Sequence, residues 1–427
     1  MQWLEAPTYW LSRFLLERSI AAVYLIAFVV ALNQFPALLG ERGLLPVPRF
    51  LRAVPWQRAP SIFYMHYSDR FLRAVACTGA VVAAALVAGI PQSGPAWVTL
   101  LGWGVLWCLY LSIVNVGQTF YGFGWESLLL EAGALAIFLG PSRLAPPAVI
   151  LWLFRWLLFR LEFGAGLIKL RGDRCWRDLT CLYYHHETQP MPNPMSWYFH
   201  RLPKAAHRIE VLGNHVAQLL IPVLLFCPQP LAGGAAIAVI VHQSWLVVSG
   251  NFSWLNALTI ALAFSALDDR QLRVLLPFHH GAIAPAPPWF TVLPLLFAAC
   301  VVLLSYRPAR NLVSRRQLMN ASFDPLHLVN TYGAFGSITK ERYEIIIEGA
   351  NGGDPADASG WREYEFKGKP GDPRRRPRQV APYHLRLDWL MWFAAMSSPL
   401  SHRWLIALVE KLLAGDEQTL KLLRRNP

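Results

Sequence analysis

Long apolar segments alternate with polar connections along the first three quarters of the chain. A run of about 20 apolar residues is long enough to cross the hydrocarbon core of a membrane as a helix. The alternation predicts eight or nine such segments, and their approximate bounds are 18–39, 71–90, 97–117, 124–140, 147–170, 208–227, 231–249, 252–267 and 289–306. We therefore expect an α-helical multi-pass membrane protein.

The composition agrees with this interpretation and restricts the partners. The chain has 427 residues, of which 55% are hydrophobic and only 15% are charged, whereas soluble domains carry about 25% charged residues. Its formal net charge of +13 comes from Lys and Arg residues that lie mostly between the apolar segments, where such residues meet anionic lipid headgroups. No nucleic-acid-binding motif accompanies them. Membrane lipid is thus an expected partner, and nucleic acid is not.

The character of the sequence changes after residue 306. We expect a polytopic helical membrane domain over residues 1–306 and a small β-rich soluble domain over residues 307–427. Residues 342–349 and 361–367 have the composition of strands, and the turn-rich sequence NGGDPADASG between them predicts a hairpin. Leu and charged residues alternate at helical spacing over 402–424, which predicts one or two terminal amphipathic helices.

Two polar connections, 40–70 and 171–207, are unusually long. The prolines and aromatic residues of the first predict short helices that lie on the membrane surface. Loops as long as the second are usually functional. With nine segments, both connections and the C-terminal domain share one side of the membrane. That side holds most of the Lys and Arg, so the positive-inside rule would make it cytoplasmic, although the rule is weak for long loops and whole domains.

The fifth apolar segment carries four charged residues, Arg155, Arg160, Glu162 and Lys169. An ionisable side chain at bilayer depth costs roughly 2.5–3.5 kcal/mol on insertion scales. Arg155, Glu162 and Lys169 are spaced by seven, nearly two helical turns, which places them on one helix face. Glu162 could neutralise either neighbour. Two interpretations stay open: a polar cavity in which Lys169 acts as a base, or an internal salt-bridge network that fixes the helix.

Further polar residues are spread over three other segments. Glu126 and Glu131 lie in the fourth, and we expect one of them to pair with Arg155 or Arg160. The sixth and seventh contain a set of amides and ionisable groups, namely Glu210, Asn214, His215, Gln218 and His242. Such residues form hydrogen bonds between membrane helices, and the alternative is that they line a central cavity.

The connection 171–207 contains three candidate groups for chemistry or cross-linking. His185, His186 and Glu187 are adjacent, and adjacent side chains in regular structure do not converge on one ion, so no metal site is expected. His186 and Glu187, with Lys169, remain weak acid–base candidates. Cys175 and Cys181 share this loop and could form a disulfide in an oxidising compartment or remain free thiols.

Complete catalytic signatures are missing from the sequence. There is no HExxH, no G-x-S-x-G and no P-loop. No cofactor is therefore identified.

Several long motifs resemble the lipase maturation factor family. They include WESLLLEAG, RLEFGAGLIKLRGDRCWRDLTCLYYHHETQPMPNP, SGNFSWLNALTIAL, YGAFGSITKERYEIIIEG and PRQVAPYHLRLDWLMWFAAM. The resemblance implies a multi-pass protein that helps secreted lipases, such as lipoprotein lipase, to reach an active folded state. It also implies that client lipases are partners and that the C-terminal domain faces the lumen of the endoplasmic reticulum in eukaryotic members. The high Ala, Arg and Pro content suggests a bacterial member, in the inner membrane.

Two hypotheses follow for the function. The first is a maturation factor for exported proteins such as secreted lipases. The second is a membrane enzyme that acts on a lipid, a quinone-like substrate or a client side chain. The membrane half is distantly similar in topology to vitamin K-dependent gamma-glutamyl carboxylase, from which no catalytic residue is transferred.

Overall fold

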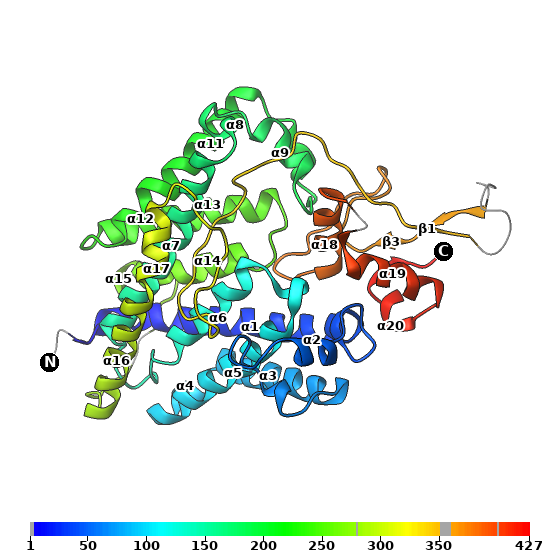
Figure 1. Ribbon diagram of the computed structural model, residues 1–427. Coiled ribbons are helices and arrows are strands. Elements are labelled where there is room, and N and C mark those ends of the chain that lie inside the picture. The colour runs from blue at the N-terminus through cyan, green and yellow to red at the C-terminus, as the bar shows by residue number, and fades with distance from the viewer. Residues whose placement is uncertain (1–3, 279–280, 351–359, 399–400) are drawn as a thin grey trace.

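The computed structural model describes residues 4–278, 281–350, 360–398 and 401–427. The longer helices of the first three quarters are α1 (Trp10–Leu39), α3 (Asp69–Ala88), α5 (Ala96–Val116), α6 (Gly124–Ala136), α7 (Ala148–Arg171), α11 (Lys204–His215), α13 (Leu231–Ser249), α14 (Leu255–Ala263), α16 (Pro288–Leu304) and α17 (Tyr306–Val313). Short helices occupy their connections: α2 (Val47–Ala53), α4 (Ile90–Ser93), α8 (Arg174–Arg177), α9 (Leu182–Thr188), α10 (Ser196–His200), α12 (Ile221–Leu224) and α15 (Asp269–Leu272) (Figure 1).

Five helical stretches in the described part are long and apolar enough to cross a membrane. They are Pro7–Leu39, Asp69–Ala88, Ala96–Val116, Leu231–Ser249 and Pro288–Val313. This confirms a helical protein with several membrane spans, but the predicted count of eight or nine is not confirmed. The other predicted segments are shorter, interrupted or charged: α6 and α14 are short, α7 carries five charged residues, and a π-helical turn (Val216–Leu220) separates α11 from α12.

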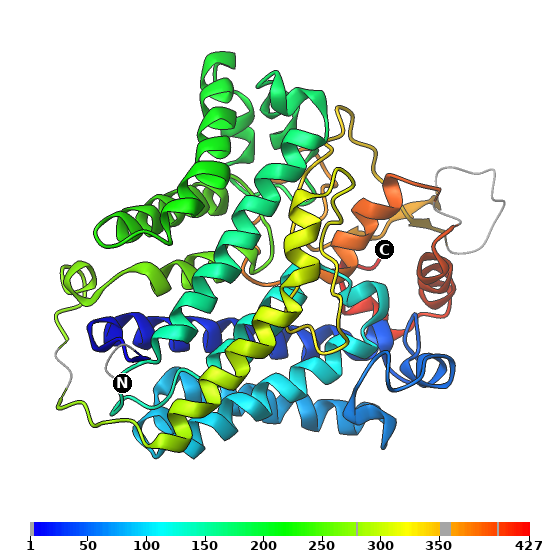
Figure 2. The same ribbon diagram turned by 60° about the vertical axis from the view of Figure 1, so that its left-hand side comes forward.

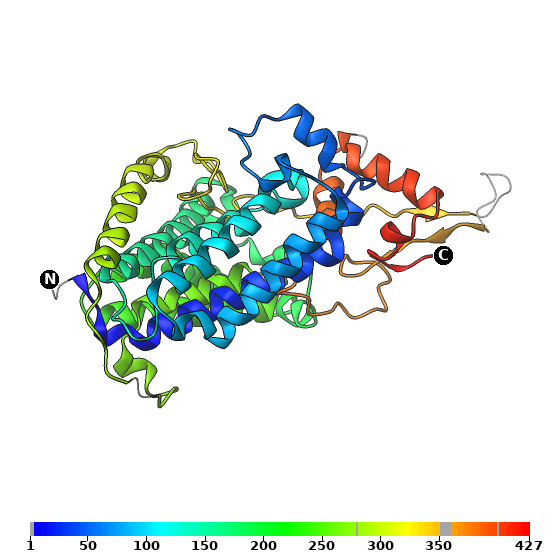
Figure 3. The same cartoon turned by 90° about the horizontal axis from the view of Figure 1, so that it is seen from below.

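Helix α1 is largely buried and packs closely against α3 (Figure 3). The close approach depends on Gly79 of α3, because a Cβ atom there would overlap the ring of Phe28. Tyr24 and Phe28 in turn contact the ring of Tyr110 on α5 edge-on. On another side, α16 packs against α7, and both cross the body obliquely (Figure 2).

The connections between helices gather at two opposite ends of the body. At one end, backbone hydrogen bonds join Ala6 to Pro146 at 2.9 Å and Ser142 to Gln92 at 2.8 Å. At the other end, the side chain of Gln34 donates to the carbonyl of His384 at 2.7 Å, and that of Asn251 donates to the carbonyl of Arg378 at 2.9 Å. We call the second the C-terminal end, because residues 378–384 of the C-terminal region lie there. The connections 40–70 and 171–207 lie there as well. In the first, the carbonyl of Leu45 accepts a hydrogen bond from the side chain of Gln118. In the second, the backbone N–H of Asp173 donates to the carbonyl of Gly336.

The C-terminal region has few strands, and the prediction of a β-rich domain is wrong in extent. Its elements are β1 (Glu348–Gly349), β2 (Arg362–Glu363), β3 (Glu365–Phe366), α18 (Arg386–Ala395), α19 (Arg403–Leu413), α20 (Glu417–Leu420) and β4 (Leu423–Arg425) (Figure 1). β1 pairs antiparallel with β2, and β3 with β4. Ile345 and Ile347 pack against the main hydrophobic core instead of forming a longer ladder. The predicted turn NGGDPADASG lies outside the described residues, apart from Gly360.

Candidate functional site

A cavity of about 730 Å³ lies between α7, α11, α13, α14 and α18, and segment 315–339 covers another side. This volume is within the range of pockets that enclose a small organic ligand. Apolar side chains such as Leu161, Leu246 and Phe252 form part of the wall. Its polar lining includes Glu162, Lys169, Asn214, Gln218, His242 and Gln243. The cavity is therefore amphipathic.

Glu162 is connected across three helices by side-chain amides. Gln243 of α13 donates to Glu162 Oε1 at 2.5 Å, and Asn256 of α14 donates to the Gln243 oxygen at 2.7 Å. Glu162 is 1% exposed. Its second oxygen, Oε2, has no hydrogen-bond partner in the described part of the chain. The buried carboxyl group thus keeps one oxygen available at the cavity wall.

Lys169 contacts two side-chain amide oxygens, whereas the sequence led us to consider a carboxylate partner. Its ammonium donates to Asn214 at 3.1 Å and to Gln218 at 2.6 Å, and it lies 5.1 Å from the ring centre of Trp176. Gln218 belongs to the π-helical turn, and such turns are frequent at functional sites. Two polar residues of the predicted sixth segment, Asn214 and Gln218, therefore accept hydrogen bonds from Lys169 of α7. His242 lies on the same cavity wall, with no hydrogen-bond partner for either ring nitrogen among the described residues.

Arg155 does not share this cavity. It donates from Nε to the carbonyl of Ser265 at 3.1 Å and stacks on the rings of Tyr9 and Trp152. Successive members of the Arg155–Glu162–Lys169 series are separated by roughly 10 Å of helix rise, and within the described residues no ion pair joins any two of them. Glu162 therefore makes no direct ion pair with Arg155 or Lys169 within the described residues.

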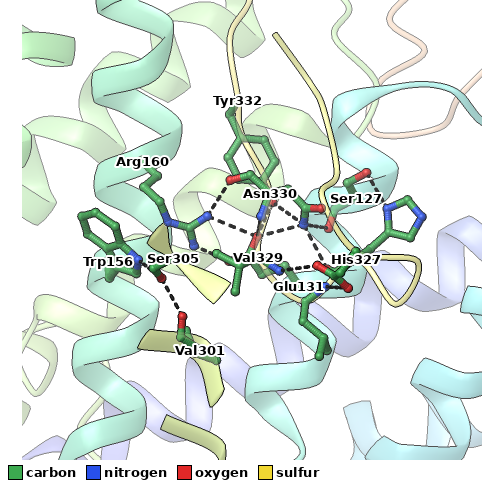
Figure 4. A network of polar contacts seen from close by, with 12 residues as sticks. Ser127, Glu131, Trp156, Arg160, Val301, Ser305, His327, Val329, Asn330 and Tyr332 are labelled. Carbon is green, nitrogen blue, oxygen red and sulfur yellow. Dashed lines mark hydrogen bonds and ion pairs between the residues drawn. The ribbon is translucent and has the colours of Figure 1, made fainter. Parts of the chain in front are cut away.

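Glu131 and Arg160 form the centre of a buried network, and both side chains are 2% exposed (Figure 4). Arg160 pairs with Glu131 and donates to the carbonyl of Asn330 at 2.7 Å. Asn330 and Tyr332 donate to Glu131 Oε2 at 2.9 Å and 2.7 Å (Figure 4). Of the pairings considered from the sequence, Glu131 with Arg160 is the one that forms. Gly164 lets the backbone at Tyr332 approach α7 closely, because a Cβ atom at position 164 would lie 2.5 Å from the Tyr332 carbonyl oxygen.

A second buried ion pair joins α6 to the C-terminal region. Arg386 Nη1 lies 2.7 Å from Glu126 Oε1, and both side chains are fully buried. The guanidinium also stacks 3.4 Å above the ring centre of Tyr121. His384 lies beside the pair, and burial lowers the pKa of its imidazole to about 4. The ring is thus neutral near pH 7, and Arg386 supplies the positive charge.

The connection 171–207 is more ordered than a loop, because α8, α9 and α10 lie within it. Arg342 donates to the carbonyls of Gln189 and Pro190, which holds the HHETQP sequence against the C-terminal region. Glu187 is 56% exposed and lies 3.3 Å from His200 Nε2. It does not line the cavity, whereas His186 does.

Sequence reasoning missed the C-terminal partners of the two buried acids. Asn330, Tyr332, His384 and Arg386 belong to motifs that the sequence does mark as unusual, NTYG and YHLRLDW. Polar and charged residues inside otherwise apolar sequence were the available signal. His215 takes a smaller part, with its Nε2 at 3.0 Å from the Trp176 carbonyl.

A disulfide links Cys175 to Cys181, with the two Cα atoms 4.8 Å apart. The linked segment is anchored where Trp176 donates to the carbonyl of Phe335 at 2.8 Å. Of the two alternatives for this pair, the structure contains the bonded one.

Removing the disulfide is expected to lower the free energy of unfolding by about 2 kcal/mol, because cross-linking a seven-residue loop reduces the entropy of the unfolded chain. The variant is Cys175→Ser with Cys181→Ser, compared with wild type by thermal unfolding in detergent. Reduced wild type should match the double variant. Cys300→Ser, which changes an exposed free thiol, is the control, and an equal loss in that variant would contradict the prediction.

Comparison with known protein families covers most of the chain. The lipase maturation factor transmembrane domain matches residues 11–274, and the lipase maturation factor C-terminal domain matches residues 328–427. Lipase maturation factor 1 of Bos taurus is 44% identical over 99% of this chain and 82% of its own length; that of Homo sapiens is 43% identical over 99% and 81%. Lipase maturation factor 2 of Gallus gallus is 29% identical over 96% and 74%.

No solved structure matches the chain. Nothing in these matches supports the likeness to gamma-glutamyl carboxylase, the membrane-enzyme alternative or a bacterial source.

Proposed function

Because this chain belongs to the lipase maturation factor family, we propose that it is a membrane-embedded factor that helps exported lipases to reach their active folded state. The observation that carries the proposal is the 44% identity to the bovine protein over 99% of the chain. Both matched domains are included in that span. Client lipases are the partners that the relatives' name implies.

The architecture supports a role in which membrane helices and C-terminal region act as one body. Glu126 on α6 is paired with Arg386, and Glu131 on α6 receives hydrogen bonds from Asn330 and Tyr332. Breaking a buried ion pair costs about 3–5 kcal/mol. The C-terminal region is thus held in a fixed position over the cavity. A client bound there would meet a rigid surface at the membrane.

We propose further that the C-terminal end faces the lumen in a reticulum membrane, or the corresponding exported side in another membrane. The Cys175–Cys181 disulfide lies at this end, where Asp173 contacts Gly336 at 2.9 Å. Disulfides persist in oxidising compartments and are rare in the cytosol. This argument outweighs the positive-inside rule, which is weak for long loops and whole domains.

Maturation activity can be measured by expressing the chain with a secreted lipase in cells that lack their own maturation factor. We expect secreted lipase activity per amount of lipase protein to rise several-fold. A secreted enzyme from another fold class is the control and should not change. If the chain reaches the membrane in folded form and lipase activity stays at background, the proposed function is wrong.

The orientation can be measured with single cysteines placed at the two ends. Ser93 and Arg374 are both exposed, at opposite ends of the body. In a background without the four free cysteines, Ser93→Cys should react with an impermeant maleimide in sealed microsomes. Arg374→Cys should react only after the membrane is opened. The reverse pattern would place the C-terminal end in the cytosol.

A further inference from the structure

Three side chains from two helices converge beside the cavity. His186 comes from α9, and His207 and Glu210 lie one turn apart on α11. Their potential ligand atoms all lie within 4.8 Å of one another. His207 Nδ1 is 3.0 Å and His186 Nε2 is 3.9 Å from the same oxygen, Glu210 Oε2. We propose that these three residues bind a divalent transition-metal ion, with zinc as the ion that best fits the ligand set.

The separations suit a tetrahedral site. Zinc binds imidazole nitrogen at about 2.0–2.1 Å and carboxylate oxygen at about 2.0–2.2 Å. Two ligands of a regular tetrahedron at those lengths are therefore roughly 3.4 Å apart. The distances of 3.0 and 3.9 Å lie on either side of that value. The third separation, between the His186 and His207 nitrogens, is at most 4.8 Å and would have to shorten on binding.

The contacts around the ligands are those that metal ligands require. His207 Nε2 lies 3.3 Å from the carbonyl of His200, and Trp245 donates to Glu210 Oε1 at 3.0 Å. In the tautomer that donates from Nε2 to this carbonyl, the neutral His207 ring carries its lone pair on Nδ1. That lone pair faces a carboxylate oxygen at 3.0 Å. In that tautomer a divalent cation between the two atoms would be bound by both. Metal-binding histidines commonly donate their other N–H to a backbone carbonyl in this way.

His186 provides a second, independent observation. Its side chain is 5% exposed, and neither ring nitrogen has a hydrogen-bond partner among the residues that the structure describes. An unsatisfied buried polar group costs about 1–3 kcal/mol. Coordination of a metal ion through Nε2 removes that cost for the nitrogen that points toward Glu210.

The site is open toward the cavity. His186, Glu210 and Trp245 all line its wall. Three protein ligands leave a fourth tetrahedral position, as in catalytic zinc sites. A water molecule or a Lewis-basic group of a cavity ligand would fill that position. The sequence-based expectation of no metal rested on the adjacent residues His185, His186 and Glu187, and it did not consider His207 and Glu210, which follow about 20 residues later.

The test is metal binding by the full chain, purified in detergent without a histidine tag. We expect one zinc per chain by inductively coupled plasma mass spectrometry, and visible d–d absorption after replacement by Co²⁺. His186→Ala and Glu210→Gln should each bind zinc at least about 100-fold more weakly, since loss of even an outer partner weakens binding about 10–100-fold. His186→Ala removes a side chain without hydrogen bonds and should keep the fold.

His200→Ala is the matched control, because it removes a neighbouring imidazole but keeps the carbonyl that contacts His207. It should bind zinc like wild type. The proposal is overturned if the folded wild-type chain binds no zinc, or if His186→Ala binds as tightly as wild type. Equal weakening in His200→Ala would also overturn it. No lipase enters the measurement, so its failure leaves the proposed function untouched.

Discussion

Replacing Arg160 with methionine should lower the free energy of unfolding by about 3–5 kcal/mol. The change leaves Glu131 as a buried charge without its ion-pair partner, which is far more harmful than losing the pair as a whole. Asn330 and Tyr332 would still donate to the carboxylate, but neither supplies positive charge. The measurement is resistance to denaturation in detergent micelles, followed by tryptophan fluorescence and by size-exclusion chromatography.

A double variant separates the charge from the packing. Glu131→Gln with Arg160→Met removes both charges and should recover more than half of the loss, because replacing both members of a buried pair is often close to neutral. Arg155→Met is the matched control on the same helix, where the guanidinium contacts a carbonyl and two aromatic rings instead of an acid. It should cost about 1 kcal/mol. A double variant no more stable than Arg160→Met would show that the network acts through shape alone.

Replacing Arg386 with methionine should detach the C-terminal region from the helical body. Glu126 then loses its positive partner in a fully buried place, and we expect a loss of about 3–5 kcal/mol. The loss should be local. Limited proteolysis should cut the chain between residues 360 and 427 at least tenfold faster, whereas fragments of the first 300 residues stay intact.

Two further variants make this second result interpretable. Glu126→Gln with Arg386→Met should restore much of the protease resistance. Arg425→Met changes a pair at 3.8 Å whose arginine is 65% exposed, and such surface pairs contribute at most about 1 kcal/mol. If Arg386→Met is cleaved no faster than Arg425→Met, the Glu126–Arg386 pair does not hold the region in place.

These pairs also determine which truncations are informative. Deleting residues 320–427 would remove Asn330, Tyr332 and Arg386 together, and so leave two buried acids on α6 with fewer partners. Lost maturation in such a truncation would reflect damage to the membrane half as well as loss of a client surface. Point variants on the exposed surface of the C-terminal region are the sharper experiment.

The sequence predicted elements better than partners. Apolar runs located α1, α3, α5, α13 and α16, since length and hydropathy decide whether a helix can cross a membrane. The helix face of Glu162 and Lys169 followed from spacing. Their partners did not, because Gln243 and Gln218 lie on other helices and one helix period says nothing about which helix is adjacent.

Pairs between residues far apart in the sequence could not be predicted either, because helix periodicity does not show which segments are adjacent in space. Glu131 meets Asn330, 199 residues later, and Glu126 meets Arg386, 260 residues later. The extent of the strands was overestimated, because the β-branched run 345–347 favours an extended backbone. An extended segment can pair with another strand or pack against the core, and here Ile345 and Ile347 pack against the core.

The Glu126–Arg386 pair has a consequence for biogenesis. A ribosome adds about 5–20 residues per second, so Arg386 emerges roughly 13–50 s after Glu126, which is about 260 residues earlier. During that interval α6 holds an acid whose final partner does not yet exist. Tyr110, whose hydroxyl donates to the other oxygen of Glu126, precedes it in the chain and can contact the carboxyl group during that interval. The helical body can therefore close fully only after Arg386 has been synthesised, so that assembly of the membrane half waits for a residue that lies outside it.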